Sequence, residues 1–275
     1  MSTKIFDCIT FYNANFLFKT RFNILKDVVD YFVVCEADKD HVGNSKKYNF
    51  DEDFYSKNMN KIIYIKATDL PNMKIKGKDD IKILKSQMEK LFAGIKHAGD
   101  NDLIILSDED EIPNPNTIKK FQSNNFKYGI FLQNLYIYKI NVQNLHEGNG
   151  NWPGSRICLK KNLKSFYKFK LLKPKNLNYP FWRIDKEKSI DLIKNGGWHF
   201  SYLMTPEQIS NKINIMAHTQ LNKKEFKNQN EIKNKIKNLQ DPFNRDYKLK
   251  KVKIDETYPD YIRKNIELYY NWIEK

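Results

Sequence analysis

The sequence predicts an α/β fold in a single domain built around a largely parallel sheet. Strand-like apolar runs alternate with helix-like patterns over about the first 110 residues, which is the order that produces a parallel sheet. The predicted strands are apolar on both faces, as strands are when helices cover both sides of a sheet. At 275 residues, with 40% hydrophobic residues, the chain is long enough to bury one large core.

The first part of the chain contains four predicted strands and two predicted helices. The strands are expected at 4–11, 31–37, 61–67 and 102–107, where short runs of apolar residues occur. The helices are expected at 16–29 and 79–98, where apolar residues recur every three or four positions. These elements make residues 1–115 an α/β half.

The predicted strands become longer and the loops change composition after Pro115. Longer strands are predicted at 128–140, 155–161 and 196–203, between loops rich in Asn, Gly and Trp. A helix is predicted at 205–218, because Thr205 can cap its N-terminus and Pro206 suits its first position. A closing helix is predicted at 258–275. The single domain therefore divides into 1–115, 116–220 and a helical, lysine-rich 221–275.

The net charge of +15 suggests a nucleic-acid partner. However, only five of the 48 basic residues are arginine, the side chain best suited to phosphates and base edges. Lysine is scattered along the chain, so we expect no nucleic-acid partner. The stretch 222–251 is denser in lysine. It is either a solvated, partly helical surface or a patch that contacts an acidic membrane surface or an acidic glycan.

Neither a membrane span nor a secretory signal is visible in the sequence. No apolar run approaches the ~20 residues that cross a bilayer, and the segment MSTKIFDCITFYNANF lacks the regions of a signal peptide. The three cysteines, Cys8, Cys35 and Cys158, fit neither a zinc pattern nor a disulfide framework. We therefore expect buried thiols and a cytoplasmic protein, peripheral at the membrane if the lysine patch contacts it.

Four consecutive acids follow the predicted strand 102–107 in the stretch DLIILSDEDEIPNP. Ligands of open α/β sheets bind beyond the carboxyl ends of the parallel strands, where these acids lie. Asp108 and Asp110 can converge on one Mn²⁺ or Mg²⁺ ion, which also relieves their mutual repulsion. The alternative is a solvated acidic turn. The sequence has no P-loop and no G-x-G-x-x-G motif, so no P-loop ATPase or glycine-rich dinucleotide site is predicted.

Three blocks occur in order: DVVDYFVVCEADKDHVGNSKKYNF (27–50), DLIILSDEDEIPNP (102–115) and GGWHFSYLMTPEQISNKI (196–213). Together they resemble the signature blocks of the family 17 glycosyltransferases, from about Ile5 to Asn265. The resemblance implies a GT-A-like, Rossmann-type mixed sheet flanked by helices, as a single catalytic domain. It implies inverting transfer from a nucleotide-sugar donor, most simply N-acetylglucosamine from UDP-GlcNAc, to a saccharide hydroxyl. Since no anchor or signal is visible, we expect a glycan or glycolipid acceptor.

With this resemblance, Asp108 and Asp110 stand at the D-x-D position of a metal site. We expect Asp110 to bind Mn²⁺ or Mg²⁺ directly, and Asp108 to reach the donor ribose, the metal or both. His199 is a further candidate ligand, since several GT-A enzymes use a late histidine, although a lone histidine on a strand is more often a core residue. The metal would bridge the donor phosphates and offset charge on the leaving nucleoside diphosphate.

Donor contacts are expected from several other side chains. Glu36, near the end of the predicted strand 31–37, is a donor contact or a surface carboxylate, and Asp38 just after the strand is a second candidate; the family block also has Glu at the position of Glu36. Glu111 is either a donor-sugar contact or a capping residue in the turn. Arg156 would pair with the diphosphate or form a structural ion pair. Trp198 would stack on a sugar ring or fill the core.

Inverting transfer needs a general base to accept the proton of the acceptor hydroxyl. Glu207, at the start of the predicted helix 205–218, and Asp185, in the stretch FWRID, are two catalytic candidates. The sequence does not decide between them. His218 is a further candidate contact with donor or acceptor. The pair Gly196 and Gly197 would permit a close backbone approach beside the predicted site.

Two other classes of function stay open. A metal-dependent phosphoryl-transfer enzyme or phosphatase also places acids after a buried strand. Ile112 stands where such sites usually have Thr or Val, which counts against this alternative. A non-enzymatic basic binding module would bind polyanions with a steep salt dependence and would not bind nucleotide sugars.

Overall fold

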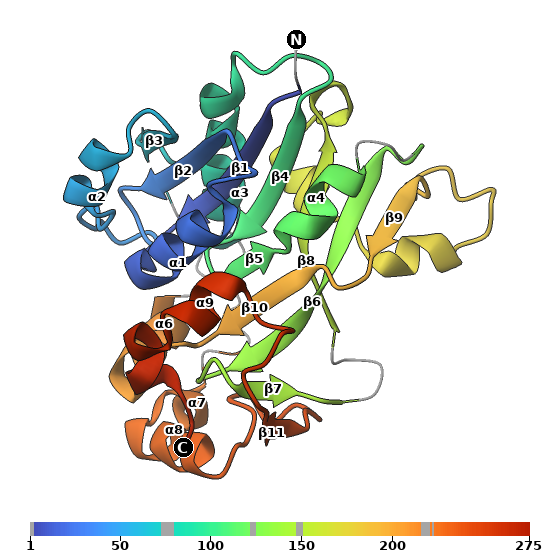
Figure 1. Cartoon of the computed structure of the whole chain (residues 1–275). Helices are drawn as coiled ribbons and strands as arrows, with labels where there is room; N and C mark the ends of the chain where they lie inside the picture. The colour runs from blue at the N-terminus through green and yellow to red at the C-terminus, as the bar shows by residue number, and fades with distance from the viewer. Residues whose placement is uncertain (1–2, 73–79, 122–124, 147–150, 216–220, 222) are drawn as a thin grey trace.

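The computed structural model of the chain describes residues 3–72, 80–121, 125–146, 151–215, 221 and 223–275. Helices flank a mixed sheet in one domain (Figure 1), which confirms the predicted fold class. The strands of the first part are β1 (Ile5–Phe11), β2 (Tyr31–Ala37), β3 (Ile62–Ala67), β4 (Leu103–Asp108) and β5 (Glu111–Pro113). Its helices are α1 (Asn15–Leu25), α2 (Glu52–Lys57), α3 (Asp80–Lys90), the 3-10 helix η1 (Leu91–Ile95) and α4 (Pro115–Phe121).

The second part adds the remaining strands and shorter helices. Its strands are β6 (Tyr128–Ile137), β7 (Val142–Asn144), β8 (Asn151–Leu159), β9 (Ile190–Ile193), β10 (Gly197–Ser201) and β11 (Leu249–Lys251). Its α-helices are α5 (Phe166–Lys170), α6 (Pro206–Ile215), α7 (Lys224–Lys227), α8 (Gln229–Lys237) and α9 (Asp260–Lys264). The 3-10 helices are η2 (Lys160–Asn162), η3 (Pro174–Asn178) and η5 (Ile266–Trp272).

The first part forms the parallel region of the sheet, in the order β4-β1-β2-β3. Successive side chains of a strand point to opposite faces, so apolar residues at every position fill two cores. In β1, Ile5 and Ile9 belong to the core under α1, whereas Phe6 and Cys8 belong to the core under α3 and η1. The three cysteines are buried and free, as predicted.

The second part makes the sheet mixed. β8 runs antiparallel to both β4 and β6, and β9 and β10 run parallel to β6. Gly196 is the last residue before β10, and Gly197, the first residue of β10, has a φ of +124°. A Cβ atom on Gly197 would lie 2.1 Å from the carbonyl oxygen of Ile112, and one on Gly196 would lie 2.6 Å from the backbone nitrogen of Leu132. The predicted close backbone approach is therefore present, and it brings β10 against β5.

Helices α6, α7 and α8 cover a third core formed with β6 and β7. α6 begins as predicted, because the N–H of Gln208 donates to Thr205 Oγ1 at 3.3 Å and the N–H of Thr205 donates to Gln208 Oε1 at 2.9 Å. The predicted strand 128–140 ends at Ile137, since Tyr138 has a φ of 67°. Among the described residues, no helix combines the length and apolar character that crossing a bilayer requires.

The last part of the chain returns to the first helix (Figure 1). Tyr269 is buried, and its hydroxyl lies 2.8 Å from Thr20 Oγ1 of α1. The predicted closing helix is two short segments, α9 and η5, instead of one. Asn265 between them has a φ of −128°, outside the helical region, and its side chain donates to the carbonyl of Tyr261 at 2.8 Å. This polar contact ends α9 and turns the chain.

Candidate functional site

The carboxyl ends of β1, β2 and β4 meet at one edge of the sheet. The register places Thr10 of β1 beside Asp108 of β4, and Phe11 of β1 beside Glu36 of β2. The acidic turn 108–111 therefore begins at the edge where open α/β sheets bind ligands. We call this turn, together with the side chains that contact it, the acidic site.

A buried arginine fixes the backbone of the acidic turn. The guanidinium of Arg21 in α1 forms two hydrogen bonds of 2.5 Å with the carboxylate of Asp7 in β1. It also donates to Ser107 Oγ at 2.8 Å and to the backbone carbonyl of Glu111. Because the two opposite charges and the nearby polar groups satisfy one another, their complete burial is tolerated. The first βα unit thus sets the conformation of the turn.

The carboxylate of Asp110 faces the imidazole of His199. β10 places His199 opposite Glu111, and the N–H of Phe200 donates to the Asp110 carbonyl at 2.9 Å. Asp110 Oδ1 and His199 Nε2 lie 3.4 Å apart, and their side chains are only 11% and 9% exposed. Trp152 packs on the His199 ring with centroids 5.0 Å apart. His199 Nδ1 has no hydrogen-bond partner among the described residues, so packing orients the ring.

Lys212 of α6 is the second neighbour of Asp110. Its Nζ lies 3.4 Å from Asp110 Oδ2. Burial opposes ionisation of Asp110, but Lys212 and His199 outweigh it and hold the pKa of this carboxyl well below its usual range. Burial likewise opposes the charge of Lys212, yet Asp110 and Glu109 raise its pKa. Asp110 is therefore an ionised carboxylate at neutral pH.

Lys170 of α5 bridges two other acids of the turn. Its Nζ lies 2.8 Å from Asp108 Oδ2 and 3.4 Å from Glu111 Oε2. Glu111 is fully buried and accepts hydrogen bonds from Trp152 Nε1 at 2.8 Å and from the N–H of Asp108 at 3.0 Å. Glu111 is thus a structural centre of the turn and is shielded from solvent.

The two acids that contact Lys170 have opposite pKa shifts. Burial opposes ionisation of Glu111, but Lys170, His199 and Arg156 lower its pKa. Burial also opposes ionisation of Asp108, and there the carboxylates of Glu111 and Asp110 add to the effect, so its pKa is raised despite Lys170. The Asp108 side chain is 42% exposed. It is consequently the acid of this pair that a ligand can reach.

Arg156 of β8 lies near these acids but binds backbone. It donates to the carbonyls of Pro153 at 2.7 Å and Leu172 at 2.9 Å. Its Nε is buried and has no partner among the described residues. Burial lowers its pKa, and the negative charges of Glu111 and Asp108 partly offset that effect. Arg156 therefore adds positive charge to the acidic site while it holds two neighbouring chain segments.

Glu109 points toward the end of β1. Its Oε2 accepts hydrogen bonds from the N–H groups of Tyr12 at 2.8 Å and Asn13 at 3.3 Å. The Nζ of Lys46 lies 5.2 Å from the ring centroid of Tyr12 and 6.0 Å from that of Tyr48. Two aromatic rings and an ammonium group therefore border the acidic site on the side of β1 and β2.

Glu36, a predicted donor contact, is fully buried at the end of β2. Its carboxylate accepts hydrogen bonds from Lys46 Nζ (2.5 Å), Asn49 N–H (2.6 Å), Phe50 N–H (3.1 Å) and Tyr64 Oη–H (2.7 Å). Glu36 thereby holds the loop 46–50 against the sheet. Asp38 differs, because its Oδ1 is buried and has no hydrogen-bond partner among the described residues. Such an acceptor is costly unless a ligand supplies a donor.

The structure does not bring Asp185 to the acidic site. Asp185 lines a cavity beside Tyr128. The sheet register places Tyr128 next to Cys158, and Cys158 next to Ile104 at the start of β4. Ile104 lies four residues before Asp108, which is about 13 Å along a strand. Asp185 is therefore at the opposite end of β4.

The remaining predicted residues have separate positions. Trp198 is buried in the core, one of its two predicted placements, and its indole N–H donates to the carbonyl of Thr257 at 3.0 Å. Glu207 is exposed in the first turn of α6, the helix that carries Lys212. His218 lies outside the described residues.

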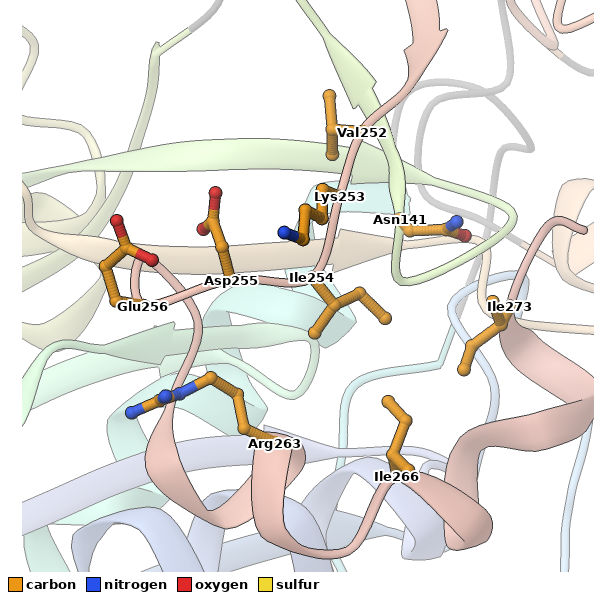
Figure 2. Close-up of a pocket in the computed structure, with 9 residues that line it drawn as sticks. All are labelled: Asn141, Val252, Lys253, Ile254, Asp255, Glu256, Arg263, Ile266 and Ile273. Carbon is orange, nitrogen blue, oxygen red and sulfur yellow. The ribbon is translucent and has the colours of Figure 1, made fainter.

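A cavity of about 670 Å³ lies away from the acidic site, between the turn after β6 and the C-terminal segment. Figure 2 shows an apolar side formed by isoleucines and a charged side. The isoleucines are Ile254, Ile266 and Ile273, and the charged side chains are Asp255, Glu256 and Arg263. No residue of the acidic turn lines this cavity. Cavity size alone therefore does not locate the candidate site.

The Asp110 and His199 pair fits a divalent cation. Their 3.4 Å separation is long for a direct hydrogen bond. Two ligands of one ion, each at about 2.1 Å, lie about 3 Å apart. Within the described part of the chain, no group of three or more His, Cys, Asp or Glu side chains could hold a metal. Mg²⁺ commonly takes one or two carboxylates and completes its shell with water and substrate phosphates. The pair therefore suits an ion shared with a phosphate-bearing substrate.

Four side chains that contact the acidic turn were not predicted from the sequence: Arg21, Lys170, Lys212 and Trp152. No local pattern distinguishes the two lysines among 48 basic residues. Trp152 carried a usable signal, because it stands four positions before the predicted Arg156 in the stretch NWPGSR.

Comparison of the chain with known protein families gives a match over most of its length. The family model described as glycosyltransferase family 17 matches residues 1–252. No curated protein matches the chain. A solved 4-diphosphocytidyl-2C-methyl-D-erythritol synthase has 10% identity and a TM-score of 0.38, over 70% of this chain and 89% of its own. The inositol-1-phosphate CTP transferase from T. maritima has 10% identity and a TM-score of 0.37, over 70% and 86%. These two similarities are too weak to bear on function.

Proposed function

The chain belongs to glycosyltransferase family 17, and from this premise we propose a specific reaction. The protein transfers N-acetylglucosamine from UDP-GlcNAc to a hydroxyl of a saccharide or glycolipid acceptor, with inversion and with Mn²⁺ or Mg²⁺. The donor sugar follows from the resemblance of the three sequence blocks to the family. The geometry of the acidic site supports the proposed metal and the proposed roles of the residues.

One observation carries the proposal. Asp110 and His199 converge to 3.4 Å at the carboxyl edge of β4, and both side chains are nearly buried. Oxygen and imidazole ligands in this arrangement suit a divalent ion that also binds phosphate. In the proposed complex, Asp110 and His199 hold the ion. Asp108, whose side chain is 42% exposed, faces the donor ribose.

The charge balance of the acidic site supports a metal. The turn supplies four carboxylates, and three cations lie close to them: Lys170, Lys212 and Arg156. One net negative charge therefore remains. A nucleoside diphosphate adds about two more negative charges, an excess that is unfavourable in a largely buried site. A divalent cation offsets this excess and the charge that develops on the leaving diphosphate.

The nucleoside end of the donor is proposed to lie at the ends of β1 and β2. Tyr12 and Tyr48 offer aromatic surfaces near the ammonium of Lys46. The unpartnered Oδ1 of Asp38 accepts a hydrogen bond from the uracil N–H or from a ribose hydroxyl. Glu36 acts indirectly, because its carboxylate is occupied in holding the loop 46–50.

Of the two predicted bases, Glu207 has the better position. It is exposed on α6, the helix whose Lys212 lies 3.4 Å from Asp110. An acceptor that enters from solvent can therefore reach it. Asp185 lies at the other end of β4, so we assign the base to Glu207. Its carboxylate accepts the proton of the acceptor hydroxyl while the bond between the sugar and UDP breaks.

Thermal shift measurements with a panel of UDP-sugars, with and without Mn²⁺, test the donor and the metal. We expect UDP-GlcNAc to raise the Tm only when Mn²⁺ is present. Stabilisation by another UDP-sugar but not by UDP-GlcNAc would overturn the donor assignment. Equal stabilisation without metal would overturn the metal dependence.

Turnover tests the reaction itself. UDP release with a mixture of saccharide acceptors should fall at least about 100-fold in Asp110→Ala and His199→Ala. Asp100→Ala, an exposed aspartate, is the matched control and should retain activity. If the protein releases no UDP but hydrolyses phosphate esters in an Asp110-dependent way, the phosphoryl-transfer alternative is correct.

A further inference from the structure

The loop 177–184, which precedes β9, exposes three large apolar side chains. Phe181 is 85% exposed, Trp182 65% and Ile184 95%. The loop is the gold segment that precedes β9 at the right-hand edge of the molecule (Figure 1). Single exposed apolar residues are common on soluble proteins, but three within four positions mark a contact surface.

Internal hydrogen bonds order this loop. The ammonium of Lys188 donates to the carbonyls of Tyr179 and Pro180. The guanidinium of Arg183 forms two hydrogen bonds of 2.7 Å with Asp185. The N–H of Ile184 donates to the carbonyl of Trp182 at 2.9 Å. These hydrogen bonds hold the loop, while its apolar side chains Phe181, Trp182 and Ile184 face solvent.

Positive charge is concentrated around the same loop. Apart from Lys170, which pairs with acids at the acidic site, residues 160–188 contain nine basic and two acidic residues, so nearly half of the net +15 falls on this stretch. A cavity of about 590 Å³ adjoins the loop and includes Ile184, Asp185 and Glu187 in its lining. Four lysines also line it: Lys127, Lys161, Lys164 and Lys168.

The two acids in the cavity lining are already engaged. Asp185 is paired with Arg183, and it also lies 3.3 Å from the ammonium of Lys186. Glu187 Oε1 accepts the N–H of Lys188 at 3.0 Å and that of Ser189 at 2.8 Å. The cavity therefore presents mainly the charge of its four lysines to a ligand.

We propose that the loop 177–184 and the four lysines of this cavity form a docking surface for an anionic phospholipid bilayer. Phe181, Trp182 and Ile184 enter the boundary between headgroups and acyl chains. The lysine ammonium groups bind the headgroup phosphates. This surface is distinct from the stretch 222–251, and it goes beyond the proposed reaction.

Charge and composition favour a lipid surface over other partners. In a symmetric contact with a second copy, two strongly positive stretches would face each other. Single-stranded nucleic acid would stack on Phe181 and Trp182, but Ile184, the most exposed of the three, has no aromatic face to offer. An anionic bilayer satisfies both the aliphatic and the cationic parts of the surface.

Vesicle sedimentation of the full chain, without donor or metal, tests the proposal. We expect binding to phosphatidylcholine vesicles that contain phosphatidylserine, and little binding to phosphatidylcholine alone. The triple variant F181S/W182S/I184S and the double variant K164E/K168E should each bind at least about ten-fold more weakly. All five side chains are exposed, so both variants should fold, and an unchanged Tm checks this.

The matched control is K233E/K237E, which makes the same charge change at exposed positions of α8. It should leave vesicle binding nearly unchanged. Loss of binding in this control but not in K164E/K168E would overturn the proposal, because the other lysine-rich stretch would then carry the contact. Anionic vesicles should also shift the tryptophan emission to shorter wavelength, and Trp182→Phe should abolish that shift.

Three further results would contradict a lipid surface. They are no binding to anionic vesicles, a dimer in solution that the triple variant dissociates, and oligonucleotide binding that the triple variant removes. Asp110→Ala should keep full vesicle binding. A failed glycosyltransferase assay and a failed membrane assay are therefore distinguishable.

Discussion

Asp110 Oδ1 and His199 Nε2 lie 3.4 Å apart, although one belongs to the turn before β5 and the other to β10. The pairing of β10 with β5 creates this contact, since the register puts His199 opposite Glu111. The chemistry proposed at the acidic site therefore depends on how closely two short strands approach. That approach can be changed without touching a charged residue.

Gly197→Ala should disrupt this approach. The alanine Cβ would lie 2.1 Å from the Ile112 carbonyl oxygen, at a φ of +124° that side chains rarely adopt. We expect a loss of more than about 1 kcal/mol in the free energy of unfolding, and a larger proportional loss of UDP release. Urea unfolding and turnover measure both. Gly99→Ala, where the nearest atom is 3.7 Å away, should change neither. Wild-type values for Gly197→Ala would contradict the structure.

Two aspartates in the same turn should respond in opposite directions to the same change. The pKa of Asp110 is lowered, so ionised Asp110 stabilises the fold at neutral pH. Asp110→Asn should lower the free energy of unfolding at pH 7 by at least about 1 kcal/mol. The pKa of Asp108 is raised, so Asp108→Asn should increase the free energy of unfolding at pH 7.

The pH dependence checks the sign of each effect. The contribution of Asp110 is fully present above its unfolded pKa of about 4 and is lost as the pH falls through its lower folded pKa. The penalty from Asp108 is present above its raised folded pKa and disappears as the pH falls toward its unfolded value. Urea unfolding from pH 7 to pH 3 should therefore bring both variants closer to wild type. Shifts of the same sign at pH 7 would refute the assignment.

Arg21→Met should destabilise the protein by about 3–5 kcal/mol, because it leaves the buried Asp7 carboxylate without its partner. Adding Asp7→Asn to this variant should restore part of the loss, since the unpaired charge is then removed. Arg263→Met, which breaks an exposed pair with Asp260, should cost less than about 1 kcal/mol. Chemical denaturation compares the three, and equal losses for Arg21→Met and Arg263→Met would argue against the buried network.

Lys212→Met should affect metal and donor in opposite ways. The Lys212 ammonium lies 3.4 Å from Asp110 and competes there with a cation. Its removal should tighten Mn²⁺ binding in the absence of donor by about five- to ten-fold, measured by calorimetry. The KM for UDP-GlcNAc should rise, because the diphosphate loses a nearby positive charge. Lys233→Met on α8 serves as control, and weaker Mn²⁺ binding in Lys212→Met would oppose the metal site.

Glu207→Gln should lower kcat by about 100-fold or more and leave the KM for UDP-GlcNAc nearly unchanged, since a base acts on the acceptor and not on donor binding. Asp185→Asn should keep kcat. The reverse result would return the role of base to Asp185 and would require the loop before β9 to reach the acidic site.

Strands that are apolar on both faces were predictable from the sequence. Observed β1, β2, β3 and β4 lie within one residue of their predicted limits, because burial in a parallel sheet leaves an uninterrupted apolar run. Strands β5, β7, β9 and β11 were missed. Each has three or four residues, too few to show a clear period, and tertiary pairing makes them strands.

The candidate site was predictable only in part. The acids after β4 were found because a strand end fixes their position. Trp198 and His199 are neighbours on a strand, so their side chains point to opposite faces. The sequence does not show which of the two faces the acidic turn and which faces the core. The positions of Lys170 and Lys212 depend on how α5 and α6 pack against the rest of the fold, and no local sequence pattern encodes that packing.

The family match ends at residue 252, yet Tyr258, Ile262 and Tyr269 beyond it are buried in the core. Phe16 of α1 contacts Tyr269 and Trp272, with ring centroids 5.3 Å and 6.4 Å apart. On the ribosome, this outer side of α1 emerges about 250 residues before the residues that cover it, a delay of roughly ten to fifty seconds. A nascent chain that exposes this aromatic surface is expected to bind a chaperone. A chain truncated at residue 252 would expose the surface permanently.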